Sequence, residues 1–323
     1  MRRHERIQGF VEEIWKWYSR HRRDLPWRRD LSINDRNERA YRVLVSEIML
    51  QQTQVERVKV IYKRFIEKFP TLVLLAAASD GQVILAWRGM GYNSRALRLR
   101  DAARTLIKNH DGMFPCDMPS LRALPGVGHY TAAAIRNFAF GIPTPCLDTN
   151  IRRIVHRVFI GPEKSDGTWL KNDAYVLELA TEILTRALTY SDACTTADWH
   201  AALMDFGSLV CTKRNPRWDI CPLTARGLCK ASYKVVHDPA LRAQRSEPGR
   251  MMGARFVPNR IFRGKIVEEL RDAPQGLALN DIGKRVCIDW SPSVHRQWLQ
   301  VLMEKLRKDR LIQKKASRYV LAE

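Results

Sequence analysis

The segment LPGVGHYTAAAIRNFAFGIPTPCLD, residues 124–148, constrains the fold more than any other part of the chain. It begins with the tight turn PGVG, whose two glycines can adopt positive φ and let another backbone approach closely. A helical pattern follows at once from Tyr130 to Phe140, and Gly141 is placed to cap its C-terminus. A helix, a glycine-rich hairpin and a second helix make a helix-hairpin-helix motif.

The hairpin is also a candidate phosphate site. The backbone amides of Gly126, Val127 and Gly128 lie at the start of the second helix, where the helix dipole favours an anion. Because GxG turns are common, an ordinary helical hairpin is the alternative. Asp148 opens a further helical pattern, from Thr149 to Phe159, so it is either a plain N-cap or a carboxylate with a chemical role.

The rest of the chain up to residue 210 has helical periodicity, and no strand-like alternation of useful length interrupts it. Residues 24–37 are polar and irregular and are expected to form a loop. We therefore predict an all-α body with two lobes. Residues 39–148 form the hairpin lobe, and residues 1–38 with 149–236 form the other. The expected helices are 5–21, 38–50, 55–69, 94–108, 172–188 and 197–210.

The C-terminal part reads as a separate module. Residues 237–260 are polar, basic and unpatterned, which predicts a linker. Residues 261–323 contain three helical patterns and then two short apolar segments around a basic tip, which predicts a small winged-helix-like domain. Such modules most often bind DNA, and contact with another protein is the alternative.

The net charge of +21 indicates a polyanionic partner, DNA or RNA rather than a membrane. No apolar run is long enough to span a bilayer, and the N-terminus lacks the apolar core of a signal peptide. Seven cysteines, an odd number, do not suggest a disulfide framework. We expect a monomer in a reducing compartment, cytoplasmic and associated with the nucleoid in a prokaryote.

A second carboxylate stands out because of its neighbours. Glu47 lies within the apolar run LVSEIML, either at the edge of a buried stripe or desolvated. Desolvation would raise its pKa, which suits a general acid. Gln51, Gln52 and Thr53 follow directly and could hydrogen-bond a base or wedge into a base stack. With the hairpin, Asp148 and the basic surface, these are the parts needed to attack a nucleotide removed from its duplex.

Five segments together resemble the helix-hairpin-helix DNA glycosylases of the endonuclease III superfamily, and within it the MutY-type adenine glycosylases. They cover roughly residues 8–230 in the family's order. The segments are SEIMLQQTQV at 46–55, GMGYNSRALRL at 89–99, LPGVGHYTAAAI at 124–135, LDTNIRRI at 147–154 and ALMDFGSLVCT at 202–212.

The resemblance implies a role for each matching residue. Glu47 matches the general acid that protonates adenine, and Asp148 matches the carboxylate that stabilises the positive sugar or bonds to it transiently. Tyr92 matches an aromatic that inserts near the orphaned partner base. The residues that fall where the family lines its adenine pocket are Gln52, Trp27 and Arg28, and the Gln51-Gln52 pair favours adenine.

Tyr130 stands where superfamily members that also cut the strand carry a lysine. The resemblance therefore implies a monofunctional glycosylase that removes a mispaired adenine, opposite 8-oxoguanine or guanine, without lyase activity. Because thymine glycosylases of G·T mismatches also carry tyrosine here, a thymine or uracil glycosylase is the first alternative. A non-catalytic DNA-binding protein on the same scaffold is the second, and its expected sign would be a lost Glu47 or Asp148.

Two departures from the family concern its cofactor and its C-terminus. The family binds a 4Fe-4S cluster through four cysteines. Three of them have counterparts in this chain, Cys211, Cys221 and Cys229, whereas Trp218 stands where the second cysteine is expected. The cluster is either lost or held by an unusual fourth ligand, and zinc is a lesser alternative. Residues 261–323 are too short and too helical for the Nudix-like domain with which MutY enzymes recognise 8-oxoguanine.

Overall fold

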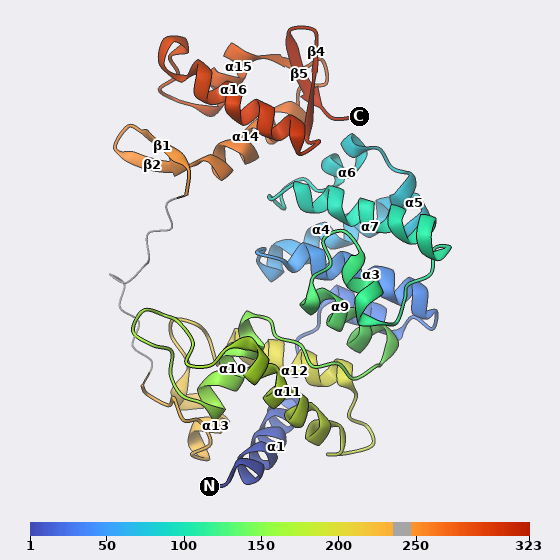
Figure 1. The fold of residues 1–323 in the computed structure, drawn as a ribbon, viewed down its shortest axis with the longest axis vertical. Coiled ribbons are helices and arrows are strands. Elements are labelled where there is room, and N and C mark those ends of the chain that lie inside the picture. Colours follow the sequence, from blue (N-terminus) through green and yellow to red (C-terminus); the bar gives the residue numbers. More distant parts are fainter. Residues whose placement is uncertain (235–246) are drawn as a thin grey trace. The chain divides into compact units, whose positions relative to one another are not determined.

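The computed structural model describes residues 1–234 and 247–323, which are mainly helical, and this confirms the predicted all-α class (Figure 1). These residues form two compact units. The first comprises residues 1–43, 116–122 and 127–234, and the second comprises residues 44–115, 123–126 and 247–323. Helix α3 (Arg36–Leu50) belongs partly to each. The expected domain boundaries stay a prediction, and residues 235–236 of the expected body and 237–246 of the expected linker lie outside the described part.

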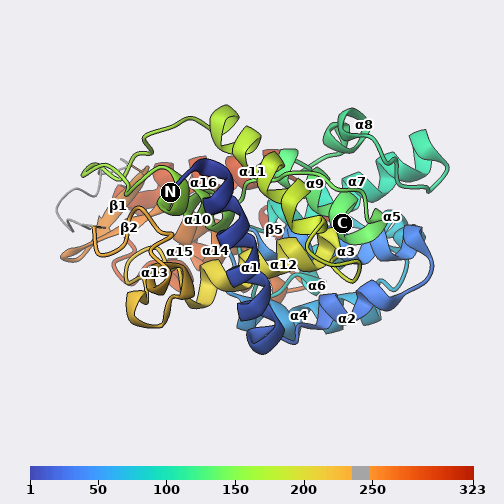
Figure 2. The ribbon, with the colours of Figure 1, turned by 90° about the horizontal axis from the view of Figure 1, so that it is seen from below.

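The first unit is organised around aromatic packing between long helices. Figure 2 shows α1 lying across α12, and the ring of Phe10 on α1 contacts Phe159 and Trp199 at centroid distances of 5.3 and 6.0 Å. The apolar side chains of α1, including Ile7, Val11 and Ile14, are buried in this core. The main helices of this unit are α1 (Arg3–His21), α9 (His129–Ile135), α10 (Thr149–Phe159), α11 (Asp173–Leu188) and α12 (Thr196–Leu209), with a π-helical turn η2 (Arg136–Phe140) after α9.

Short elements complete this unit and correct one expectation. Residues 24–37, expected to form a loop, contain α2 (Pro26–Arg29) and η1 (Asp30–Ser32). Pro26 occupies the first helical position, where its missing N–H costs nothing. The other short helices are α8 (Met118–Ala123), whose last residue belongs to the second unit, η3 (Trp218–Ile220) and α13 (Pro222–Ala225).

The second unit contains four helices after α3 and then the C-terminal elements. The four are α4 (Val55–Lys68), α5 (Leu72–Ala77), α6 (Asp80–Ala86) and α7 (Ser94–His110). The C-terminal elements are α14 (Asn259–Arg271), β3 (Leu277–Ala278), α15 (Leu279–Val286), α16 (Pro292–Lys308), β4 (Ile312–Lys315) and β5 (Arg318–Leu321). The strands form an antiparallel sheet in the order β3-β5-β4, and this succession of elements is that of a winged helix.

The expected linker is wrong over residues 249–258, which form a β-hairpin. Strands β1 (Gly249–Met252) and β2 (Arg255–Pro258) pair antiparallel around a turn with Gly253 at φ +59°. Strands of four residues are too short to show a pattern in sequence, and tertiary contacts hold this pair in place. Val257 is buried in the C-terminal core, and the Arg250 guanidinium lies 5.2 Å from the ring centroid of Trp298.

The C-terminal elements share a core with the helices of the same unit. Ile84 of α6 and Leu97 of α7 belong to the same buried cluster as Phe262 and Ile266 of α14. Polar contacts reinforce this packing, because the Arg88 guanidinium lies 2.5 Å from the Asp272 carboxylate. No helix in residues 1–234 or 247–323 combines the length and apolarity needed to cross a membrane.

A close contact between α10 and α12 generates the first prediction. A Cβ at Gly207 would stand 2.6 Å from the Cβ of Asn150, a separation that forces a shift. We expect Gly207→Ala to lower the free energy of unfolding by about 1–3 kcal/mol through overpacking. The urea midpoint should fall while the slope stays constant.

The matched control is Gly264→Ala in α14, where a Cβ would meet no atom within 4 Å. That change should be neutral or should stabilise by about 0.4–1 kcal/mol. A Gly207→Ala protein as stable as the wild type would contradict the close packing of α10 on α12.

Candidate active site

The hairpin contains a buried residue between two exposed glycines. Gly126 has φ +80°, and a Cβ there would lie 3.1 Å from the Cβ of Arg98, so both the conformation and the space require glycine. Val127 is buried, which anchors the turn. Gly128 has φ −87° and serves as the N-cap of α9, so positive φ is needed at one glycine and not at both. Gly141 adopts the left-handed conformation predicted for the helix cap, at φ +67°.

Asp148 is the N-cap of α10 and is only partly exposed. Its Oδ1 accepts the Ile151 N–H at 2.6 Å, and its Oδ2 accepts the Asn150 amide at 3.0 Å. Burial raises the pKa of the Asp148 carboxyl, whereas these two donors and the charge of Arg153 act against that rise. The capping role and a chemical role are thus compatible, because the carboxylate is held in place by the helix that it caps.

Arg153 links this helix to the end of α12. Its guanidinium donates to the carbonyl oxygens of Cys211 at 2.6 Å and Gly207 at 2.7 Å, and to the Asn150 side chain at 2.6 Å. The amide that contacts Asp148 is therefore itself fixed by a buried cation. This network lies wholly within the first unit.

Tyr130 lies on α9 in the first unit, partly buried against its core. Its hydroxyl is 3.8 Å from the Met204 sulfur. The side chain at this position is a phenol and has no amine. We expect base removal without strand cleavage for this reason.

Glu47 lies in the part of α3 that belongs to the second unit and is 6% exposed. The neighbouring residues Ser46, Ile48 and Met49 are exposed by 2% or less. The carboxylate is therefore not at the exposed edge of the helix, and the sequence interpretation of a desolvated group is the one that the fold supports.

Gln52 and Tyr92 occupy the tips of two loops of the second unit. Both have positive φ, 56° and 45°, which is uncommon for residues with a side chain. Tyr92 is 47% exposed, and Gln52 is exposed too, whereas Gln51 is half-buried. Strained, exposed loop tips are typical of residues that act on a partner.

A buried arginine holds these two loops together. The Arg95 guanidinium donates to the carbonyl oxygens of Ile48 at 3.0 Å and Met49 at 3.1 Å, and also to that of Gln51. From the other loop it binds the carbonyl oxygens of Met90 and Gly91, each at 3.2 Å. Burial lowers the pKa of Arg95 to about 10, so it stays charged at neutral pH.

Trp27 and Arg28 were expected to line an adenine pocket, and the structure gives both a place in the first unit. Trp27 is buried, and the two terminal nitrogens of Arg28 each lie 2.7 Å from the fully buried Asp205 carboxylate. Asp205 also accepts the backbone N–H and the Nε of Arg23, at 3.0 and 2.7 Å. The guanidinium of Arg28 is thus committed to an internal ion pair.

Sequence reasoning missed Asp205 and Arg95 as organising residues. Asp205 stands in the apolar run ALMDFGSLV, the same signal that identified Glu47, so it could have been found. Arg95 gave no such signal, because most of its partners are backbone carbonyl oxygens, which every residue carries and which leave no mark in the sequence.

The cysteine loop does not present a metal site. No group of three histidine, cysteine or acidic side chains in residues 1–234 and 247–323 is arranged to hold a metal ion. Cys211 Sγ accepts a hydrogen bond from Arg157 at 3.7 Å, and the Cys229 thiol lies 3.5 Å from the Arg157 carbonyl oxygen. Burial raises the pKa of Cys229 to about 11, and Trp218 packs beside Tyr233. These residues do not fit a four-thiolate cluster.

Comparison with known proteins defines the class. Residues 45–174 match the family described as HhH-GPD superfamily base excision DNA repair protein. The structure is similar to that of a thermostable thymine-DNA glycosylase, with a TM-score of 0.60 and 28% identity over 72% of this chain and 98% of that one. A trapped endonuclease III–DNA intermediate has a TM-score of 0.58 at 22% identity, with 72% and 99% covered, which shows the fold alone. The protein is a helix-hairpin-helix DNA glycosylase.

Sequence relatives narrow the class. The adenine DNA glycosylase of Mycolicibacterium smegmatis is 38% identical over 261 residues, 81% of this chain and 80% of that protein. The enzyme of the same name from Mycobacterium tuberculosis is 36% identical over 80% of this chain and 77% of its own length. The human one is 38% identical over 73% of this chain and 41% of its length. The chain belongs to the adenine DNA glycosylase family, as the resemblance implied.

The environment of Asp148 generates a prediction about pH. In the role that the resemblance implies, Asp148 stabilises a positive sugar as the carboxylate, so we expect base release to fall as the pH drops through the pKa of Asp148, which burial raises. Asn150→Ala removes a hydrogen bond that favours the charged form. We expect the acid limb of the single-turnover rate profile to move to higher pH.

Asn172→Ala is the control, since Asn172 caps α11 by accepting the Tyr175 N–H and does not contact Asp148. It should lower stability and leave the acid limb in place. An unmoved limb in Asn150→Ala would show that the contact with Asn150 does not control the ionisation of Asp148.

Proposed function

We propose that the protein is a monofunctional DNA glycosylase of base excision repair that removes a mispaired adenine, opposite 8-oxoguanine or guanine, from duplex DNA. The observation that carries the proposal is a half-buried, helix-capping carboxylate, Asp148, in a chain similar over four-fifths of its length to an enzyme named for adenine. Both Glu47 and Asp148 are present, which argues against a non-catalytic DNA-binding protein.

The chemistry follows from the two carboxyl groups. Glu47, in its protonated form, donates a proton to the adenine ring, so that the electron pair of the breaking bond between C1′ and the base nitrogen can leave with the base. The sugar becomes positively charged, and the fixed negative charge of Asp148 stabilises it more than it stabilises the neutral substrate. Water then adds at the sugar carbon and loses a proton to the solvent, which balances the proton that Glu47 gave to the base. Tyr130 offers no amine to attack the sugar, so the product is an intact abasic strand.

The remaining site residues bind and distort the duplex. Gly126, Val127 and Gly128 hold the phosphate backbone through their amides. Tyr92 enters the stack, and Gln51 and Gln52 help to extrude the base. Trp27 and Arg28 line the adenine pocket. The ion pair with Asp205 holds the Arg28 side chain in position there. A basic surface supplies affinity that falls steeply with salt. One chain carries every group, so a monomer suffices, and a prokaryotic location would be the nucleoid.

A thymine or uracil glycosylase of G·T and G·U mismatches is the second candidate. It is favoured by the similarity to a solved thymine-DNA glycosylase and by the tyrosine at position 130. The identity to enzymes named for adenine is higher, which places adenine first.

We propose further that the loop of Cys211, Cys221 and Cys229 folds without an iron–sulfur cluster. The support is that Trp218 offers no thiolate and that Arg157 contacts both the Cys211 sulfur and the Cys229 thiol. Arg157 is fully buried and also pairs with Glu163 at 2.7 Å, so the loop has a polar anchor of its own.

A panel of duplexes tests the substrate. We expect adenine release from A·8-oxoguanine and A·G duplexes, seen as strand breaks only after alkali treatment. Asp148→Asn, with similar size and no charge, should reduce the rate by several orders of magnitude and still bind. Product from G·T and G·U alone would overturn the adenine assignment, and breaks without alkali would overturn the assignment of Tyr130.

Metal analysis of anaerobically purified protein tests the cysteine loop. We expect iron far below one cluster per chain and no broad visible absorbance. Stoichiometric iron that disappears in Cys221→Ser would refute the cluster-free loop.

A further inference from the structure

Arg271, the last residue of α14, reaches from the C-terminal elements to the loop that carries Tyr92. Its side chain is fully buried. One terminal nitrogen donates to the Asn93 side-chain oxygen at 3.0 Å and to the Ile84 carbonyl oxygen at 2.9 Å, and the other pairs with Glu268. The C-terminal elements are therefore bonded directly to the residue that follows Tyr92. We call the bond between Arg271 and Asn93 the loop clamp.

Asn93 gives up its usual role to make this contact. It is the N-cap of α7, and an asparagine at that position normally accepts a hydrogen bond from the first turn of the helix. Within residues 1–234 and 247–323 its side chain makes no such capping bond, and its oxygen accepts from Arg271 instead. Asn93 is 5% exposed, so the contact is shielded from water. A buried bond that replaces a cap indicates that the position of Asn93 is set from α14.

The backbone of Tyr92 needs support from both sides. Its φ of 45° is uncommon for an aromatic residue, and such conformations persist only where the surrounding structure over-determines them. Arg95 holds the two residues before it, by binding both of their carbonyl oxygens. Arg271 holds the residue after it, Asn93. The loop clamp is thus the second of two supports for the strained residue.

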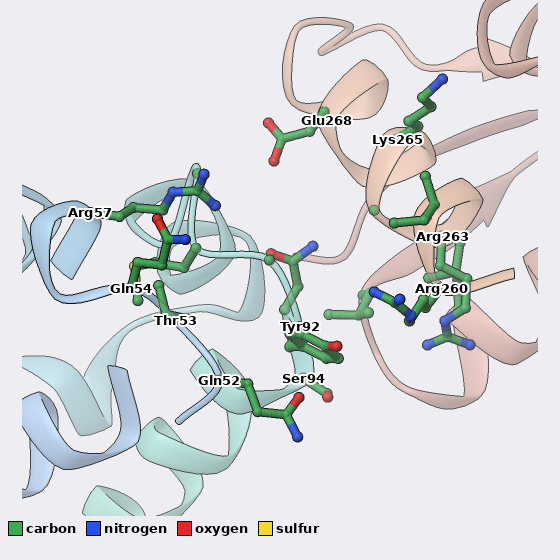
Figure 3. Close-up of a pocket in the computed structure, with 18 residues that line it drawn as sticks. Gln52, Thr53, Gln54, Arg57, Tyr92, Ser94, Arg260, Arg263, Lys265 and Glu268 are labelled. Carbon is green, nitrogen blue, oxygen red and sulfur yellow. The ribbon is translucent and has the colours of Figure 1, made fainter. Parts of the chain in front are cut away.

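The two supports leave the aromatic ring available to a partner. Tyr92 is 47% exposed, and Figure 3 shows it beside a cavity, opposite Arg260 and Arg263 of α14. The bonds of Arg271 go to neighbouring side chains and to a backbone carbonyl oxygen. They fix where the ring stands without covering it.

Other contacts attach the C-terminal elements to α6 and α7 away from this loop. The Arg310 guanidinium, just before β4, pairs with the Asp101 carboxylate of α7. A Cβ on Gly81 of α6 would stand 2.5 Å from the Ala322 carbonyl oxygen, so the end of the chain lies close against that helix. Because these contacts remain, loss of Arg271 should loosen the loop without detaching the C-terminal elements.

We propose that Arg271 is a positioning residue for DNA recognition, which through Asn93 holds Tyr92 in the exposed conformation that enters the duplex. The inference rests on the proposed function, in which Tyr92 enters the base stack. A ring that is already in place loses little freedom on binding, so its pre-organisation raises affinity. A mismatched pair opens at lower cost than a matched one, so the gain falls on mismatched DNA. The C-terminal elements thus act on mismatch preference from within the protein.

Binding to two duplexes separates this role from a purely structural one. The first probe is an A·8-oxoguanine duplex whose target adenosine carries a 2′-fluorine, which resists base loss, and the second is the fully paired duplex. Arg271→Met should lower the preference for the mismatched duplex on the order of tenfold, with unchanged affinity for the paired one. Arg310→Met, which removes the contact with Asp101, is the matched control and should keep the wild-type preference.

A double-mutant cycle identifies the aromatic ring as the target. Asn93→Ala removes the acceptor and leaves the other bonds of Arg271 in place. It should reproduce the loss seen in Arg271→Met, and the two changes together should lose no more than either alone. In a Tyr92→Ala background, Arg271→Met should have no further effect on the preference. If Arg271→Met does not fold, Asn93→Ala takes its place in the cycle.

Hydrogen exchange checks the loop clamp in the free protein. Backbone amides on both sides of Tyr92 are hydrogen-bonded, among them those of Met90 at 3.1 Å and Arg95 at 2.9 Å. Opening of the loop exposes such amides to solvent. Exchange over residues 90–96 should therefore be faster in Asn93→Ala than in the wild type, and equal exchange would contradict the clamp.

An unchanged mismatch preference in Arg271→Met or in Asn93→Ala would overturn the inference. An effect of Arg271→Met that persists in the Tyr92→Ala background would also overturn it, as would an equal loss in Arg310→Met, since either would assign the change to general packing. These readouts need no base release. A protein that shows the expected preferences and releases no adenine would contradict the proposed function alone.

Discussion

The hydrogen bonds of the buried Arg95 guanidinium are the interaction on which the two exposed loop tips of the second unit depend. It binds carbonyl oxygens at the end of α3, directly after Glu47, and carbonyl oxygens of the loop before Tyr92. It also lies over the Trp87 and Tyr92 rings, at 5.5 and 5.6 Å from their centroids. A cation at the C-terminus of a helix is favoured by the helix dipole, and unpaired carbonyls in a buried loop would be costly. One side chain thus joins the C-terminal end of α3 to the loop of Tyr92 within the same unit.

Buried arginines recur through the fold, and they change the meaning of the high positive charge. Arg28 with Asp205, Arg153 with carbonyl oxygens, Arg157 with Glu163 and Arg271 with Asn93 each join segments that are distant in sequence or belong to different elements. The planar guanidinium suits this work because it satisfies several acceptors at once. Part of the net charge of +21 is therefore structural, and the remaining exposed cations provide the attraction to DNA.

Asp148 illustrates a compromise between burial and charge. In the proposed role, burial strengthens the interaction of Asp148 with a positive sugar, since electrostatic effects grow as water is excluded, but burial also raises the pKa of the carboxyl. The amide of Asn150 and the N–H of Ile151 limit that cost, and Arg153 holds Asn150 in place. The C-terminal elements also contact the loop of Tyr92, because Arg271 of α14 donates a hydrogen bond to the side chain of Asn93.

The sequence by itself determined the helical class and the hairpin, and it supplied the candidate residues for the chemistry. Those features are local: helical periodicity, a Gly126 that needs positive φ, a carboxylate inside the apolar run around Glu47, and an aspartate before a helical pattern. Only the tertiary structure decided that Arg28 belongs to Asp205, that residues 249–258 pair as strands and that α14 faces Tyr92. The first and the third depend on groups far apart in the chain, and the strands of the second are too short to leave a pattern. Backbone carbonyls, the partners of Arg95, carry no sequence signature at all.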